Sequence, residues 1–209
     1  MSLAISPEIR VGGSVFTSED LMEIAKVAGN DVKIELTTFQ QLIIEIEAEQ
    51  AEQAKRQLEE QGLCVYQTGS VVENLSVCNF CKGAEIEGLD AARNVNEAIA
   101  GIPTPFTMRV GYSGCPNACG EPLLKDIGIV KRKQSFDIYI GGTPKTLKAG
   151  TAKLLMEQVN ETELPELVKK LITLYQQYGL KKEKFNEFIS RHGMESIKKQ
   201  LSIPKDSVG

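Results

Sequence analysis

Histidine is nearly absent from this sequence, because His192 is the only one among 209 residues. Imidazole is the side chain that most often ligates transition metals and transfers protons near neutral pH. A metal site in this chain must therefore be built mainly from thiolates. A mechanism that needs a histidine base has a single candidate.

Long apolar runs and a targeting segment are also lacking. No window approaches about eighteen consecutive apolar residues, and the first residues, MSLAISPEIR, have neither the basic start nor the apolar run of a signal peptide. The net charge is -4, so the chain has no broad basic field of the kind that binds nucleic acid. We therefore expect a cytoplasmic protein with no membrane or nucleic-acid partner.

The N-terminal part of the chain has the pattern of a small α+β unit. Apolar periodicity and end signals predict a helix over 17–29, strands over 31–38 and 41–48, a helix over 49–63 and a short strand over 64–66. Thr17 caps the first helix, and Gly29 ends it. We assign residues 1–66 to a first domain.

The rest of the chain, residues 67–209, is assigned to a second domain. Its pattern predicts a helix over 88–101, a strand over 105–113, a hairpin over 126–142 and terminal helices within 163–179 and 181–201. Lys131, Arg132 and Lys133 lie at the predicted turn of the hairpin, and we expect them to form a solvated tip. The predicted fold class is α+β.

Four of the five cysteines form two close pairs. Cys78 and Cys81 have two residues between them, and Cys115 and Cys119 have three, within the segment VGYSGCPNACGEP. Each pair can reach one ion or one cluster, so the spacing permits tetrahedral zinc as well as an iron-sulfur cluster. Cys64 stands alone, and we expect it to be a buried thiol.

The residues around the second pair favour a cluster over zinc. Gly114 and Pro116 open this loop and Gly120 closes it, which suits neither a helix nor a strand. Such a loop leaves backbone N–H groups free to point at the sulfurs of a cluster. Ordinary buried cysteines are a third interpretation of the pattern.

The segment GYSGCPNACGEPLLKDIGIV, followed by FDIYIGG, resembles the sirohaem and 4Fe-4S domain of nitrite and sulfite reductases. That family has a G-C-P-N-x-C segment before a D-I-G strand and a Y-x-G-G strand. Upstream, RVGGSVFTSEDLMEIAKVAGNDVKIELTTFQQLIIEI resembles the ferredoxin-like half-domain that precedes it. The resemblance covers roughly residues 8–180 and implies a ferredoxin-like half-domain followed by a mixed-sheet domain.

The resemblance implies a coupled redox site. A 4Fe-4S cluster would be bound by Cys78, Cys81, Cys115 and Cys119, and Cys119 would also bridge to the iron of sirohaem. Electrons would pass from a donor protein through the cluster to the tetrapyrrole. Sirohaem carries many carboxylates, so it needs cations around it. The further residues that we assign to cofactor binding are Gly114, Asn117, Arg109, Lys145 and Lys148.

The sequence departs from the family pattern in two places. Leu75 stands where the family commonly has its first cysteine, and the thiol lies at Cys78 instead. The four positions at which the family binds its anion with Arg and Lys carry Phe39, Glu73, Pro105 and Thr107. A small anion that is reduced with proton uptake needs positive charge and donors around it. We therefore expect no brisk reduction of sulfite or nitrite.

Two other functions remain open at this point, namely a non-catalytic 4Fe-4S module for electron transfer or redox sensing and a structural zinc protein. The reductases carry this pair of units twice, whereas this chain has one copy. A single copy would expose apolar surface and a sheet edge. The simplest remedy is a twofold-symmetric homodimer, which we expect here.

Overall fold

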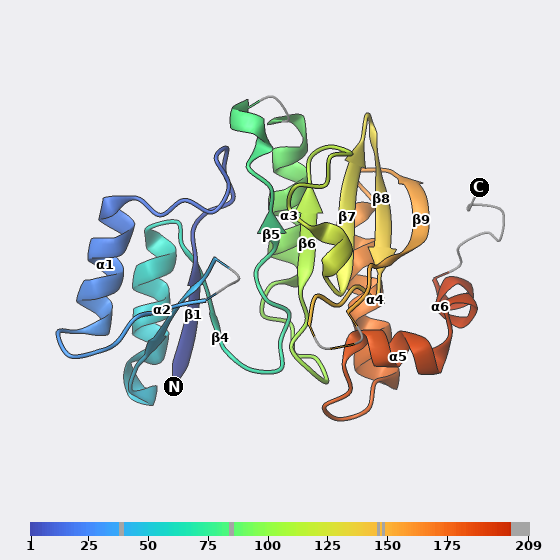
Figure 1. Ribbon diagram of the computed structural model, residues 1–209. Helices are drawn as coiled ribbons and strands as arrows, with labels where there is room; N and C mark the ends of the chain where they lie inside the picture. Colours follow the sequence, from blue (N-terminus) through green and yellow to red (C-terminus); the bar gives the residue numbers. More distant parts are fainter. Residues whose placement is uncertain (38–39, 84–85, 146, 148, 202–209) are drawn as a thin grey trace.

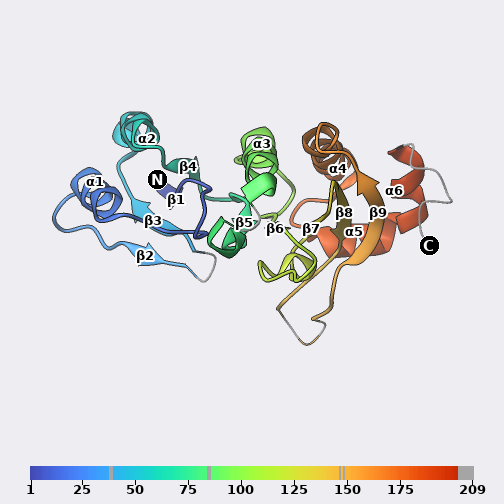
Figure 2. The same cartoon turned by 90° about the horizontal axis from the view of Figure 1, so that it is seen from above.

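The computed structural model describes residues 1–37, 40–83, 86–145, 147 and 149–201. It is an α+β fold with two sheets side by side, as predicted (Figure 1). Helices α1 (Ser18–Ala28), α2 (Ala51–Glu60), α3 (Leu89–Ile99) and α4 (Leu164–Tyr178) lie along the same side of the two sheets (Figure 2). None of the helices in the described ranges is both long and apolar enough to cross a membrane.

The first sheet is antiparallel, with the strand order β2-β3-β1-β4. The elements follow the chain as β1 (Ser2–Ser6), α1, β2 (Glu35–Leu36), β3 (Leu42–Glu45), a 3-10 turn η1 (Ala48–Gln50), α2 and β4 (Cys64–Gln67). This βαββαβ sequence is the ferredoxin-like arrangement. Leu42 and Ile44 of β3 share a hydrophobic core with Ile24 of α1 and Leu58 of α2.

The predicted elements of this part are largely confirmed. The helix over 17–29 is α1, and it begins with a capping box in which Asp20 N donates to Thr17 Oγ1 (3.1 Å) and Thr17 N donates to Asp20 Oδ2 (2.6 Å). The strand predicted over 31–38 is too long, because β2 is an edge strand that leaves Ile34 40% and Leu36 72% exposed. Strand β1 was not predicted, because its central position buries consecutive residues and so removes the alternation that marks a strand.

The second sheet has the order β5-β6-β7-β8-β9, formed by β5 (Ser76–Val77), β6 (Val110–Ser113), β7 (Ile127–Arg132), β8 (Ser135–Ile140) and β9 (Lys153–Val159). β5, β6 and β7 are parallel to one another, and β8 and β9 continue the sheet antiparallel. Two short helices, α5 (Phe185–His192) and α6 (Met194–Gln200), follow α4. The mixed sheet that the family resemblance implied is therefore present.

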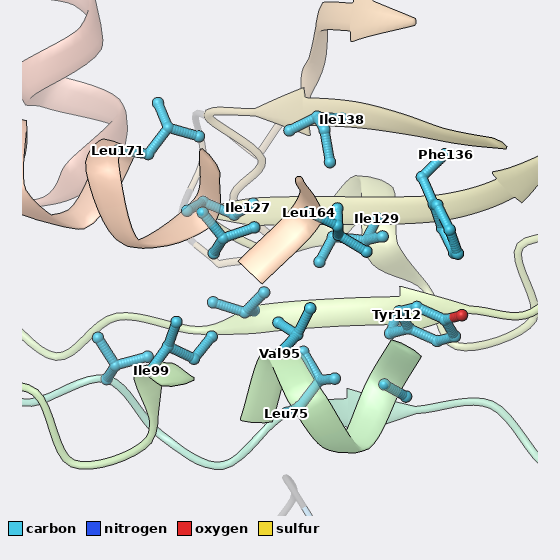
Figure 3. Close-up of a cluster of buried hydrophobic side chains, with 14 of the residues drawn as sticks. Leu75, Val95, Ile99, Tyr112, Ile127, Ile129, Phe136, Ile138, Leu164 and Leu171 are labelled. Carbon is cyan, nitrogen blue, oxygen red and sulfur yellow. The ribbon is translucent and has the colours of Figure 1, made fainter. Parts of the chain in front are cut away.

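The core of this second part lies between the sheet and α3 and α4. Figure 3 shows side chains of the strands gathered against side chains of both helices. The labelled members are Leu75, Val95, Ile99, Tyr112, Ile127, Ile129, Phe136, Ile138, Leu164 and Leu171, all of them buried. Full burial of one such aliphatic side chain stabilises the fold by about 1.5 to 3 kcal/mol. The core therefore holds the strands in place, and with them the strand ends at which the loops begin.

Two expectations for the second part are wrong in detail, and one strand was missed. The strand predicted over 105–113 is only β6, and β9 was not predicted at all. The basic tip of the hairpin is not wholly solvated: Lys131 is buried, and its Nζ donates to Lys133 O at 2.5 Å. β9 was missed because tertiary contacts with β8, not local alternation, make this segment a strand.

The two parts meet through hydrogen bonds that join distant segments. Arg93 Nε donates to Ile9 O (2.9 Å), and Arg93 Nη2 donates to Glu8 Oε1 (2.9 Å). Asn74 Nδ2 donates to Cys64 O (3.3 Å). β4 ends at Gln67, next to the proposed boundary between residues 66 and 67, and each part has its own hydrophobic core.

Candidate functional site

Cys78 and Cys81 lie directly after β5, around the short 3-10 helix η2 (Phe80–Gly83). Cys78 is buried, and its N–H donates to Tyr112 O at 3.1 Å, which extends the pairing of β5 with β6. Phe80 and Cys81 adopt φ of 49° and 41°. Left-handed backbone is unfavourable for such residues, and the buried ring of Phe80, which lies 6.1 Å from that of Tyr112, holds it in place. The tight turn leaves Cys81 exposed.

The second pair lies in the loop that follows β6, on the side of the sheet opposite α3 and α4 (Figure 2). Gly114 N donates to Cys78 Sγ at 3.3 Å, so this loop is in direct contact with the first pair. Ala118 N donates to Cys115 O at 3.2 Å, which closes a turn between the two cysteines. The loop thus presents Cys115 half-buried and Cys119 exposed.

All four paired thiols line one cleft of about 570 Å³. Its other lining residues are Gln40, Ser76, Val77, Asn79, Phe80, Ser113, Gly120, Glu121 and Lys125. Among the described residues, no group of three or more His, Cys, Asp or Glu side chains has the geometry to hold one metal ion. Thiols spread around a cleft suit a cluster, whose irons each take a separate ligand, better than one tetrahedral ion.

Gly120 allows the two cysteine segments to lie close together. A Cβ at Gly120 would lie 2.6 Å from Tyr112 O, 3.0 Å from Ser113 Oγ and 3.1 Å from Cys78 N. Gly120 N also donates to Ser113 Oγ at 3.0 Å. Any larger residue would push the loop away from Cys78, so this position needs glycine for close approach and not for an unusual φ.

Two charged groups follow the loop, the buried Lys125 and the half-buried Asp126. Lys125 lines the cleft, and burial lowers its pKa, while the carboxylate of Glu121 acts in the opposite direction. Burial raises the pKa of Asp126 to about 6, although Arg109 N donates to its Oδ2 at 2.8 Å. This hydrogen bond fixes Arg109 at the N-terminal end of β6.

A second hollow, which we call the groove, lies beside the cleft and measures about 460 Å³. The open face of the first sheet forms one wall, and the segments before β5 and β6 form the other. Its lining residues are Ala4, Glu35, Leu36, Thr37, Gln41, Ile43, Tyr66, Thr68, Gly69, Glu73, Thr107, Arg109 and Lys145. The adjacent residues Gln40 and Gln41 line the cleft and the groove respectively, so the two hollows are neighbours.

Arg109 in the groove is paired with a carboxylate. Its Nε lies 3.0 Å from Glu73 Oε2, and its Nη2 lies 3.5 Å from Glu73 Oε1. Thr107 Oγ1 donates to Gly69 O at 2.8 Å. Positions 73 and 107, at which the family resemblance placed anion-binding cations, therefore line the same groove.

The residues predicted for the site fall into two groups. The four cysteines line the cleft, and Gly114 contacts one of them through its N–H. The carbonyl oxygen of the exposed Asn117 lies 4.0 Å from Cys119 Sγ. Arg109 and Lys145 line the groove instead. Lys148 and Phe39 lie outside the described residues, and Pro105 is not among the residues that line either hollow.

Sequence reasoning missed Lys125, Ser113 and Gln40 at the cleft. The sequence offers only a weak indication of Lys125, which lies two residues before the buried strand β7 and directly before Asp126. Cys64 is half-buried, with burial as the main cause of its raised pKa, and its Sγ lies 3.8 Å from Asn96 Nδ2. Cys64 is not among the residues that line the cleft, and it is less buried than the sequence predicted.

Comparison with known proteins agrees with this arrangement. The model of the nitrite and sulphite reductase 4Fe-4S domain matches residues 69–207. The chain is 25% identical over 189 residues to a cobalt-factor III methyltransferase of Priestia megaterium, covering 90% of this chain and 34% of that protein. It is 27% identical over 142 residues to an assimilatory-type sulfite reductase of Nitratidesulfovibrio vulgaris, covering 66% of this chain and 62% of that protein. The chain thus spans less than two thirds of the length of both relatives.

Two solved structures share the fold. Dissimilatory sulfite reductase I superposes with a TM-score of 0.75 at 12% identity, over 97% of this chain and 69% of that one. The Mycobacterium tuberculosis NirA protein superposes with a TM-score of 0.67 at 14% identity, over 96% of this chain and 39% of that one. Since the family model covers more than half of the residues, the chain belongs to the nitrite and sulphite reductase 4Fe-4S domain family.

Proposed function

We propose that this protein is an iron-sulfur redox protein whose 4Fe-4S cluster is bound by Cys78, Cys81, Cys115 and Cys119. The observation that carries the proposal is that these four thiols line one cleft. A bound cluster would supply transfer of one electron at a time. The bound group would also explain why the chain keeps two cysteines exposed next to a buried core.

The surrounding residues would tune such a cluster in two ways. The Gly114 N–H that donates to Cys78 Sγ would stabilise negative charge on that sulfur and so raise the reduction potential. The exposed Cys119 would leave one edge of the cluster open toward a second redox centre or a donor protein. In our proposal Cys119 is the thiolate that can also reach a tetrapyrrole iron.

Sirohaem is the second cofactor that the family membership suggests, and the groove, which adjoins the cleft, is the hollow in which its fit can be examined. The family membership and a relative named as a sulfite reductase hemoprotein, from Xylella fastidiosa and 35% identical over 95 residues, support it. The charges of the groove do not match: Arg109 and Lys145 stand against Glu35 and Glu73, and Arg109 is already paired. The described residues therefore do not neutralise the many carboxylates of sirohaem.

A second candidate function is a cluster module that transfers electrons without reducing a substrate of its own. A specific observation favours it: 90% of this chain is similar to a segment of a protein named as a methyltransferase. The segment is therefore not confined to proteins named as sulfite or nitrite reductases. The paired Arg109 in the groove agrees with the same interpretation.

The proposal includes an electron-donor protein and a symmetric homodimer. β2 is the edge strand of the first sheet, and it exposes Leu36 next to the exposed Ile34. An exposed apolar edge invites pairing with another chain. A second copy of this chain would cover that edge on both partners at once.

The test begins with protein purified without oxygen. We expect about four iron atoms and four sulfides per chain and a broad cluster absorption, both lost when any of the four paired cysteines is changed to serine. The Cys64→Ser variant is the matched control, and it should keep its iron. A colourless wild-type protein that contains zinc, or serine variants that keep the cluster, would contradict the proposal.

The same preparation separates the two candidate functions. Tetrapyrrole bands after expression with a sirohaem supply, together with turnover of a substrate by reduced viologen, would identify a reductase. A cluster spectrum without tetrapyrrole bands would identify the electron-transfer module. In either case we expect no brisk reduction of sulfite or nitrite, because the groove presents Arg109 in an ion pair.

A further inference from the structure

The pair of Glu73 and Arg109 is the main charged feature on the wall of the groove that faces the first sheet. The guanidinium meets the carboxylate at two points, with Nε to Oε2 at 3.0 Å and Nη2 to Oε1 at 3.5 Å. The two side chains are only 15% and 27% exposed, so water screens the pair incompletely. Two-point contacts between arginine and a carboxylate are stronger and more directional than single ones.

The backbone holds both partners in register. Glu73 N donates to Met108 O at 2.9 Å, and Arg109 N donates to Asp126 Oδ2 at 2.8 Å. These hydrogen bonds fix the main chain at residues 73 and 109 and so keep the two side chains within reach of each other. Separating them would leave a poorly solvated charge on each, which is costly.

Other donors of the groove are engaged in the same way. The hydroxyl of Thr107 donates to Gly69 O at 2.8 Å, and the hydroxyl of Tyr66 donates to Gln41 Oε1 at 3.0 Å. Among the described residues, the charged side chains that line the groove are Glu35, Glu73, Arg109 and Lys145, two of each sign. A small oxyanion would need several converging donors and net positive charge, and the part of the groove lining that the structure describes offers neither.

We propose that Glu73 is a specificity-determining residue that excludes small oxyanions from the groove by occupying the guanidinium of Arg109. The proposal rests on the proposed function only in placing this groove next to a cluster. Replacement of one carboxylate would then create an oxyanion site without any added cation. Arg109 and Lys145 would supply the positive charge, and the amide of a glutamine at position 73 would add a donor.

The experiment uses the full chain, purified without oxygen, with inorganic sulfate as a redox-inert oxyanion followed by calorimetric titration at low ionic strength. We expect no saturable sulfate binding by the wild type and saturable binding by Glu73→Gln. Its affinity should exceed that of the Glu35→Gln control by at least about tenfold, which corresponds to about 1.4 kcal/mol. The matched control is Glu35→Gln, which removes the same charge from the same groove and leaves the ion pair intact.

Each outcome decides the proposal. Binding by Glu73→Gln that disappears in the double variant with Arg109→Gln supports it. Equal gains in Glu73→Gln and Glu35→Gln would overturn it, since net charge alone would then explain the effect. Saturable binding by the wild type would also overturn it, and this result needs no variant to fold.

The two proposals fail separately. Iron and sulfide content reports on the cluster, whereas sulfate binding reports on the groove. A protein that lacks a cluster but gains sulfate binding in Glu73→Gln would leave the role of Glu73 intact and refute the proposed function. A protein with a full cluster whose Glu73→Gln variant gains no sulfate binding would leave the proposed function intact and refute the role of Glu73.

Discussion

Replacement of Gly120 by alanine tests whether the two cysteine segments depend on each other. The new Cβ would lie 2.6 Å from Tyr112 O and 3.1 Å from Cys78 N, which are both main-chain atoms. These two atoms are joined by the hydrogen bond that extends the pairing of β5 with β6. The loop must therefore move away from Cys78, or this hydrogen bond must lengthen.

The expected loss of stability follows from two contributions. Overpacking at a tightly packed position costs about 1 to 3 kcal/mol, and a weakened buried hydrogen bond costs about 0.5 to 1.5 kcal/mol. We expect the free energy of unfolding to fall by about 2 to 4 kcal/mol. Since the Gly114 N–H and the thiols of Cys115 and Cys119 belong to the loop that moves, the iron content should fall as well.

Urea unfolding and iron analysis of protein purified without oxygen measure both effects. The control is Gly150→Ala, because among the described residues, its own chain neighbours apart, no heavy atom lies within 4 Å of the Cβ that it adds. That variant should unfold within about 0.5 kcal/mol of the wild type. If Gly120→Ala kept wild-type stability and a full complement of iron, the close approach of the loop to Cys78 would not matter for the site.

Two further predictions concern the half-buried carboxyl group of Asp126 and the edge of the first sheet. Burial raises the pKa of Asp126 from 3.8 to about 6, so the folded state loses stability, about 3 kcal/mol as an order of magnitude, as the pH rises through this interval. Asp126→Asn should abolish this loss. If urea unfolding gave the wild type and the variant the same dependence of stability on pH, the prediction would be refuted. Leu36→Lys should convert the expected dimer to a monomer in sedimentation experiments. The control is Leu180→Lys, at a leucine that is 59% exposed, and it should leave the dimer intact. A monomeric wild type would refute the dimer.

Local patterns predicted the elements whose signals are local. The helix over 17–29 was predicted because Thr17 caps it and its apolar residues recur at helical spacing, and both causes operate within the helix itself. β1 and β9 were missed because neither has an alternation of its own. Their strand conformation depends on partners that are remote in the sequence, such as Ile44 opposite Leu3.

The cysteine spacing and the glycine-rich loop were enough to predict thiolate chemistry, because few other functions place two close pairs of cysteines in a chain with one histidine. Sequence also identified Glu73 and Thr107 as replaced positions, through the family resemblance alone. It could not predict that Glu73 meets Arg109, since 35 residues separate them and side-chain pairing depends on the folded geometry.

The sequence by itself thus determined which groups are available: four thiols, a loop with exposed N–H groups and a shortage of anion-binding cations. The tertiary structure decided which of them meet. The parallel pairing of β5 with β6 brings Cys78 to the Gly114 N–H, and the main-chain contacts before β6 bring Arg109 to Glu73. The physical reason is that types and spacing of residues are local properties, whereas convergence on a cleft or neutralisation of a charge needs contacts between distant segments, which only the packed core holds in register.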